Sequence, residues 1–154
     1  MKPVTVSTDV PQTPEQVHDF LDVMAHHERL TDHYLTDWHF SGPPRGIGSC
    51  AAVTASLGGT RTDVTIEVVE AVPPRLIVER NVSWAGRRLA HGTYTIEPLR
   101  NGGSHVSFTY TWTRTPLADR LLAPVLRATM RRANRTVMRR LATELIRHVS
   151  ATEA

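Results

Sequence analysis

The C-terminal part of the sequence carries one long amphipathic helix pattern, which follows the last of a series of strand patterns. The strand patterns end at Thr115-Pro116, and the helix pattern continues almost to the C-terminus. At about 100° per residue, one stripe of this helix collects Leu126, Met130, Ala133, Asn134, Val137, Met138, Leu141 and Leu145. A single helix cannot cover a broad sheet completely, so we expect a hollow between helix and sheet that holds a small apolar molecule.

Two prolines divide the start of this helix pattern. Proline is tolerated in the first turn of a helix but not in its interior, where its ring clashes with the preceding turn. We therefore expect a short separate turn after Pro116 and a main helix that begins at Pro124.

Length and composition indicate one ordinary globular domain. The 154 residues form a single domain over 1–154, with a frayed tail at about 150–154. The absence of both a basic, apolar leader and a run of about 18 apolar residues predicts a cytoplasmic protein. Cys50 is the only cysteine, so neither an intrachain disulfide nor a thiolate metal cluster is expected.

The basic residues are nearly all arginines, and many fall on the C-terminal helix. Lys2 is the only lysine among 18 basic residues, and the net charge is +3. The helical arginines are Arg120, Arg127, Arg131, Arg132, Arg135, Arg139, Arg140 and Arg147. They form either a solvated face or a docking surface for an acidic partner such as a carrier protein, a membrane or nucleic acid, of which nucleic acid is the least expected.

The N-terminal part predicts a strand and two short helices. Apolar and polar side chains alternate from Val4 to Val10, as in a half-buried strand. Thr13 and Gln16 have the spacing of a capping box, which predicts that a helix begins at Pro14. A second short helix is expected over 27–34.

Alternation with a period of two predicts six further strands between Thr36 and Thr113. Pro43-Pro44, Gly58-Gly59, Pro73-Pro74 and Asn101-Gly102-Gly103 separate several of them. The side chains that we assign to the inner face are Trp38, Phe40, Ala51, Val53, Ala55, Leu57, Val64, Ile66, Val68, Leu76, Val78, Arg80, Val82, Trp84, Ala90, Gly92, Tyr94, Ile96, Val106, Phe108, Tyr110 and Trp112.

The order of these elements, together with the segments PEQVHDFL, Gly46-Ile47-Gly48, PPRLIVER and YTIEPLRNGGSHVSFTY, resembles the SRPBCC superfamily. This superfamily has the helix-grip fold of START domains, birch-pollen-allergen-like proteins and bacterial polyketide cyclase/dehydrases. The resemblance implies an α+β fold in which a curved seven-stranded antiparallel sheet wraps around a long C-terminal helix, with two short helices after the first strand. It also implies a cavity between sheet and helix.

Arg80 is the first candidate for chemistry in this cavity. It shares the parity of Val78 and Val82, and an inward charge is costly unless it is paired or meets water or ligand oxygens. Either it pairs with an acidic residue or reaches the cavity mouth, or it binds an enolate, carboxylate or ketone oxygen. The resemblance to aromatase/cyclases implies the second role, with tyrosines and bound water promoting aldol closure and dehydration.

Other polar and aromatic side chains are candidates for the cavity wall. Tyr94, Tyr110 and Asn134 lie on apolar faces, where their polar ends either complete core hydrogen bonds or contact a ligand, and both tyrosines are candidates for proton transfer. Tyr34 lies at a helix-to-strand junction, where the resemblance places a residue at the cavity entrance. The remaining wall candidates, for which core packing is the simpler interpretation, are Trp38, Phe40, Trp84, Phe108, Trp112, Met130 and Met138.

Other types of site are disfavoured. The eight histidines show no metal-ligand spacing, and no phosphate loop, dinucleotide-binding fingerprint or nucleophile elbow is present, so no metal or cofactor is expected. Glu67, Glu79 and Glu97 have outward parity, which argues against a pair of catalytic carboxylates. A one-residue error in parity would exchange the two faces, and His91 would then enter the cavity.

Three functions remain. The chain is predicted to be a cofactor-free cyclase, aromatase or dehydratase of bacterial secondary metabolism, acting on a small hydrophobic or polyketide-like molecule. The alternatives are a carrier that holds a lipid-like or polycyclic molecule without changing it, and a macromolecular adaptor that uses the arginines of the last helix. An enzyme needs Arg80 or a tyrosine, a carrier needs mainly volume, and an adaptor needs the arginines.

Overall fold

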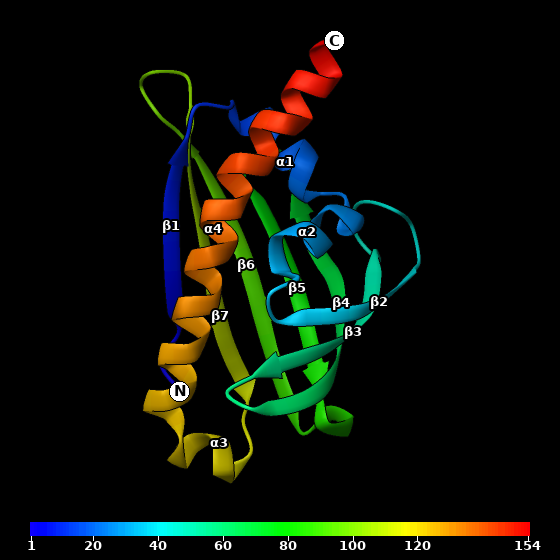
Figure 1. Ribbon diagram of the computed structural model, residues 1–154, viewed down its shortest axis with the longest axis vertical. Helices are drawn as coiled ribbons and strands as arrows, with labels where there is room; N and C mark the ends of the chain where they lie inside the picture. The colour runs from blue at the N-terminus through cyan, green and yellow to red at the C-terminus, as the bar shows by residue number, and fades with distance from the viewer.

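The computed structural model describes all 154 residues, and its main element is a curved antiparallel sheet with a long helix against its concave face (Figure 1). The strands are β1 (Val4–Val10), β2 (Leu35–Ser41), β3 (Cys50–Leu57), β4 (Thr60–Val72), β5 (Leu76–Ser83), β6 (Arg88–Pro98) and β7 (Ser104–Arg114). Their order in the sheet is β1-β7-β6-β5-β4-β3-β2, so the first strand pairs with the last. The predicted helix-grip fold with seven strands is confirmed.

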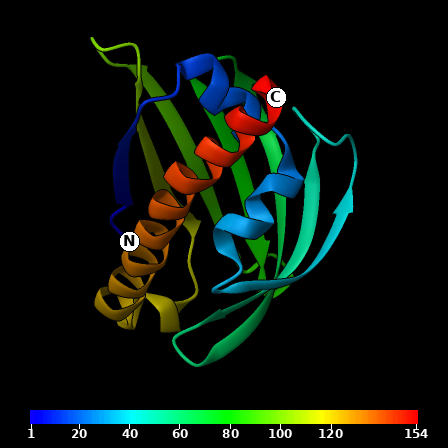
Figure 2. The same ribbon diagram turned by 45° about the horizontal axis from the view of Figure 1, so that its top comes forward.

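The helices lie on the same side of the sheet, where α1 and α2 both contact α4 (Figure 2). The α-helices are α1 (Pro14–Leu21), α2 (His27–Thr31), α3 (Leu117–Leu121) and α4 (Ala123–Glu153), and the short 3₁₀ turns are η1 (Met24–His26) and η2 (Trp84–Gly86). Helix α3 is separate from α4, as the two prolines predict. The main helix begins one residue before Pro124.

Helix α1 begins where the predicted capping box places it. The Gln16 amide N–H donates to Thr13 Oγ1 at 3.3 Å, and the Thr13 amide N–H donates to Gln16 Oε1 at 3.0 Å. These two bonds satisfy backbone donors that the first turn of a helix leaves free. The helix then buries Val17, Phe20 and Leu21 against the rest of the molecule.

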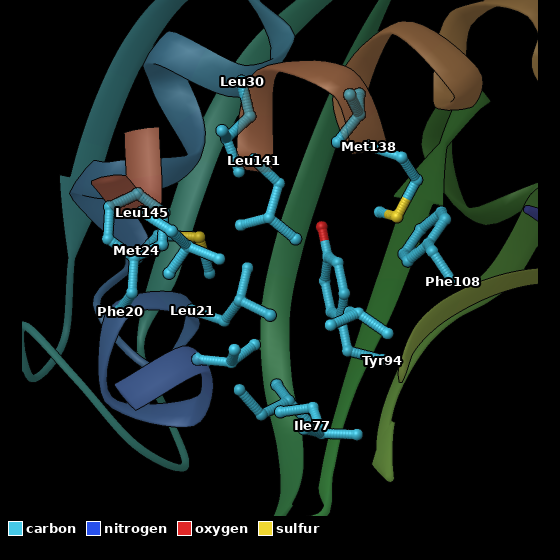
Figure 3. Packing of buried hydrophobic residues seen from close by; sticks show 14 of the residues in the cluster. Phe20, Leu21, Met24, Leu30, Ile77, Tyr94, Phe108, Met138, Leu141 and Leu145 are labelled. Atoms are coloured by element: carbon cyan, nitrogen blue, oxygen red, sulfur yellow. The ribbon is translucent and has the colours of Figure 1, made fainter. Parts of the chain in front are cut away.

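The core lies between the sheet and the apolar stripe of α4. The buried residues of α4 are Met130, Ala133, Asn134, Val137, Met138, Leu141 and Leu145, all of which belong to the predicted stripe. Figure 3 shows Leu141 and Leu145 in one cluster with residues of α1 and α2 and with Tyr94 and Phe108 of the sheet. Each fully buried leucine stabilises the folded state by about 2 kcal/mol, because its side chain is removed from water.

Strand β5 is the one strand whose predicted parity is wrong. Its inner face carries Ile77, Glu79 and Ser83, which are buried, whereas Arg80 is exposed. The prediction failed because the segment LIVERNVS has apolar residues on both faces, and counting them favours the face of Leu76 and Val78. In the folded chain a polar row faces inward on this strand.

His26 is partly buried, and we expect this to make the stability of the fold sensitive to acid. Its ring stacks on Phe20 with 4.5 Å between centroids, and its Nδ1 lies 2.7 Å from the Phe20 carbonyl oxygen. Burial lowers the pKa of His26 below its usual value of about 6.5. The contribution of His26 to stability is therefore complete above about pH 6.5 and is lost as the pH falls through the lowered folded value.

We expect His26→Gln to weaken the loss of stability below about pH 6.5, as measured by urea unfolding at several pH values. Glutamine keeps a polar group near the Phe20 carbonyl but does not gain a proton in this range. His39→Gln, at an exposed position of β2, is the matched control and should keep the wild-type profile. An unchanged acid response in His26→Gln would contradict this assignment.

Candidate functional site

A cavity of about 140 Å³ lies between α4 and the concave face of the sheet. Side chains of strands β2 to β7 and of helices α2 and α4 form its wall, most of which is apolar. Eight of the predicted site residues line it, namely Tyr34, Trp38, Tyr94, Phe108, Tyr110, Trp112, Met130 and Asn134. The hollow expected from one helix across a broad sheet is therefore present.

In β6 and β7 the predicted alternation of inner and outer side chains agrees with the structure. Tyr94, Phe108, Tyr110 and Trp112 all face the cavity, and the Tyr94 and Phe108 ring centroids are 4.7 Å apart. Gly92 makes room for this cluster, because a Cβ atom at that position would lie 2.8 Å from the Phe108 ring. The missing side chain on β6 thus allows the Phe108 ring to lie over that strand.

Arg80 does not lie in the cavity, so the prediction of an inward guanidinium at this position is wrong. It points to the outer face of the sheet, where its side chain is 45% exposed. Its Nη2 donates to Glu67 Oε2 at 2.6 Å, and Glu67 is the directly opposite residue on β4. The parity error in β5 accounts for this position, and the Arg80–Glu67 pair is the structural role considered above.

Three other predicted wall residues lie elsewhere. Phe40 pairs with the buried Ala51 and so has the predicted parity, but on the edge strand β2 it is 48% exposed and does not line the cavity. Trp84 is 44% exposed because it leaves the strand in the η2 turn at φ 51°. Met138 is buried beside Phe108 in the core cluster (Figure 3). It does not line the cavity.

Glu79 and His27 form a buried polar pair in the cavity wall that the sequence analysis did not identify. Glu79 Oε1 lies 3.2 Å from His27 Nδ1, and each side chain is 6% exposed. His27 Nε2 lies 2.7 Å from the carbonyl oxygen of Leu21, at the end of α1. The prediction that Glu79 points outward is wrong, whereas Glu67 and Glu97 do face outward. No sequence pattern connects His27 on α2 with a central strand.

Burial shifts the ionisation of the groups that face the cavity. It raises the pKa of Tyr34, Tyr94 and Tyr110, so these phenols stay neutral and can donate hydrogen bonds. Asn81 partly opposes the shift at Tyr110. Burial also raises the pKa of Glu79, an effect that His27 partly offsets. Glu79, with His27 beside it, is therefore a better candidate than the tyrosines for proton exchange in this cavity.

A cavity arginine is present, but at position 88. Its Nε donates to Asp119 Oδ2 at 2.6 Å and its Nη2 donates to Asp119 Oδ1 at 2.8 Å, in a two-pronged pair that joins β6 to α3. The guanidinium also lies 4.8 Å from the centroid of the Trp84 ring. Because Asp119 already neutralises it, Arg88 holds α3 in place beside the cavity rather than presenting a free cation.

His91 lies on the outer face of β6, opposite to Tyr94 in parity, and does not line the cavity. No group of three or more histidine, cysteine or carboxylate side chains lies close enough together to hold a metal ion. None of the helices is both long and apolar enough to cross a membrane.

The arginines of α4 are only partly paired. Arg140 forms an ion pair with Asp32, and Arg147 pairs with Glu144 at 3.0 Å. Arg131, Arg132 and Arg135 form no ion pair. The docking surface for an acidic partner stays a prediction.

Comparison with known proteins places the chain among helix-grip proteins. A family model described as "Polyketide cyclase / dehydrase and lipid transport" matches residues 1–145. The Zhui aromatase/cyclase from Streptomyces sp. R1128 superposes with a TM-score of 0.77 at 15% identity, covering 96% of this chain and 95% of that one. No curated protein matches the sequence significantly.

Two further solved structures share the fold. The protein TTHA0849 from Thermus thermophilus superposes with a TM-score of 0.70 at 18% identity, covering 96% of this chain and 99% of that one. The major latex-like protein 151 from Panax ginseng has a TM-score of 0.66 at 11% identity, with 93% and 96% covered. At these identities the likeness concerns the fold alone.

Proposed function

Because the chain belongs to the polyketide cyclase/dehydrase and lipid-transport family, we propose that its cavity binds a small, mainly apolar ketone and that the protein is a cofactor-free enzyme of the cyclase, aromatase or dehydratase type. The observation that carries this proposal is an apolar cavity into which a few buried, protonatable groups converge. A non-catalytic carrier is the alternative, since the same cavity could hold a molecule unchanged.

The volume of the cavity limits the ligand to about one ring. An engineered apolar cavity of about 150 Å³ binds benzene, whereas pockets for drug-sized ligands measure about 300–1,000 Å³. The cavity here has about 140 Å³. A longer polyketide chain would need additional space.

The polar groups suit a carbonyl substrate. The hydroxyl groups of Tyr34, Tyr94 and Tyr110 are neutral and can donate hydrogen bonds to carbonyl oxygens, which stabilises negative charge that develops there. The apolar wall keeps water away, so these hydrogen bonds are stronger than in solution. In this proposal the tyrosines, and not Arg80, orient and polarise the substrate.

Filling the cavity should abolish binding of a one-ring ketone. Phenylacetone is a suitable probe, and Ala55→Phe places a ring into the cavity from β3. We expect this variant to bind the probe about tenfold more weakly or worse, as measured by ligand-observed NMR titration. Native mass spectrometry of the purified wild-type protein would show in addition whether a metabolite copurifies.

Ala52→Phe is the matched control, because Ala52 is an exposed residue of the same strand. It should bind phenylacetone as the wild type does, and thermal melting should show that both variants are folded. Equal binding by the wild type and a folded Ala55→Phe variant would contradict a ligand site in this cavity.

A further inference from the structure

We propose that Glu79 and His27 share one proton in the cavity wall and act as a general acid–base pair, in which Glu79 exchanges a proton with the carbon atom next to the ligand carbonyl group. This inference rests on the proposed function in one respect, namely that the ligand is a ketone. The arrangement of the two side chains is independent of that assumption.

The hydrogen-bond partners of His27 determine where its protons lie. Nε2 is 2.7 Å from the Leu21 carbonyl oxygen, which can only accept, so Nε2 carries a hydrogen atom. Nδ1 is 3.2 Å from Glu79 Oε1, within ion-pair distance, and this buried oxygen forms no hydrogen bond. A neutral imidazole with hydrogen on Nε2 presents a lone pair at Nδ1, so a carboxylate there would leave two acceptors facing each other.

One additional proton removes this conflict. Either Glu79 is a neutral carboxylic acid that donates to Nδ1, or His27 is an imidazolium that donates to the carboxylate. In both forms the pair has no net charge, which is the state favoured where each side chain is only 6% exposed. The elevated pKa that burial gives Glu79 agrees with retention of this proton.

The other groups packed around the pair leave it as the proton-exchanging group of the cavity. The Tyr94 ring stands nearly perpendicular to the His27 ring, at 86° with 5.7 Å between centroids. Tyr34, in the turn between α2 and β2, and Tyr110, from β7, are neutral phenols. Across the cavity Arg88 is neutralised by Asp119. No unpaired charge therefore faces Glu79 from any neighbouring element.

The Glu79–His27 pair can both remove a proton from the substrate and return it at the end of the reaction. In its ionised form, the Glu79 carboxylate takes a proton from the carbon next to the carbonyl group, and the C–H electron pair becomes the C=C bond of an enolate. The enolate oxygen carries the charge, which the His27 imidazolium balances and a tyrosine hydroxyl stabilises by donating a hydrogen bond.

Attack of the enolate carbon on a second carbonyl carbon of the same molecule forms one C–C bond. Glu79 then returns its proton to the new alkoxide oxygen, which regenerates the pair. The product has the composition of the substrate, so the step consumes no oxidant, reductant or cofactor. The structure thus assigns an intramolecular aldol closure, or the simpler keto–enol interconversion, to this site.

Hydrogen–deuterium exchange at the CH₂ group of phenylacetone tests the proposal without knowledge of the natural substrate. In D₂O the shared proton is replaced by deuterium, which Glu79 returns to the carbon atom. We expect the wild type to accelerate this exchange and Glu79→Gln to lose about 100-fold or more of the acceleration, measured by ¹H NMR. The variant should bind phenylacetone within about threefold of the wild type, because glutamine can still donate to His27 Nδ1.

Glu67→Gln is the matched control, since Glu67 lies on the outer face of the adjacent strand β4 and contacts Arg80 instead of the cavity. It should exchange phenylacetone at the wild-type rate. Equal rates in the wild type and Glu79→Gln would overturn the role of Glu79. Binding without accelerated exchange in the wild type would overturn catalysis and favour the carrier function, whereas a failure to bind the probe would reject the proposed function itself.

The pH dependence of stability tests the shared proton separately. Because burial raises the pKa of Glu79, its contribution to stability is complete below the ordinary glutamate pKa of about 4.3 and is lost as the pH rises through the raised folded value. Glu79→Gln should remove this loss of stability at rising pH, whereas Glu67→Gln should keep it. If the free energy of unfolding of Glu79→Gln depended on pH as that of the wild type does, the pair would not hold the proposed shared proton.

Discussion

Replacing Leu141 by alanine should lower the free energy of unfolding by about 3–4 kcal/mol, the largest loss that we expect from one core substitution. Leu141 is completely buried at the centre of the α4 stripe, where it packs between residues of α1, α2 and the sheet (Figure 3). Alanine would leave a cavity that the surrounding helices cannot fill. Urea unfolding monitored by circular dichroism measures the loss.

Ile146→Ala is the matched control for this experiment. Ile146 is on the same helix but 57% exposed, so its truncation should cost less than about 1 kcal/mol. Because Leu141 does not line the ligand cavity, Leu141→Ala should still bind phenylacetone well below its melting temperature. A loss of less than about 1 kcal/mol for Leu141→Ala would contradict the packing of α4 described above.

Replacing Asp119 by alanine should release α3 and lower the free energy of unfolding by about 2–3 kcal/mol, because it leaves the Arg88 guanidinium without its carboxylate. We place the loss below that of a fully buried ion pair, since the Arg88 side chain is 20% exposed and also contacts the Trp84 ring. Amide hydrogen exchange should become faster in residues 117–122, which report on α3.

Arg120→Ala is the control for Asp119→Ala, because Arg120 is the next residue of α3 and is exposed. It should change neither the free energy of unfolding nor amide exchange appreciably. If Asp119→Ala left exchange in α3 at the wild-type rate, the pair would not be what holds this helix. Faster exchange together with binding of larger ketones would show that the contact of α3 with Arg88 limits the space for the ligand.

The strands near the C-terminus show where sequence reasoning succeeds. In β7, Val106, Phe108 and Tyr110 alternate with small polar residues, and only one face of the strand can be buried. The apolar stripe of α4 is equally clear. In both elements the hydrophobic effect alone decides which side faces inward, so periodicity predicted the residues correctly.

Strand β5 shows where the same reasoning fails. Its inner face carries Glu79, Asn81 and Ser83, while Leu76 and Val78 are half-buried on the other face. A rule that assigns apolar residues inward necessarily selects the wrong face of a strand that carries polar groups into a cavity. For this reason the sequence pattern indicated Arg80 as the inward residue in place of its neighbour Glu79.

The amino-acid sequence by itself determined the order of helices and strands, the hollow beneath α4 and most of its aromatic wall, because these follow from periodicities of apolar residues along the chain. The family followed from the resemblance of several sequence segments to a known superfamily. Only the tertiary structure decided which polar groups face the hollow. His27 and Glu79 belong to elements far apart in the chain, as do Arg88 and Asp119. Their pairing depends on strand register and on the position of α2 and α3, which local patterns do not encode.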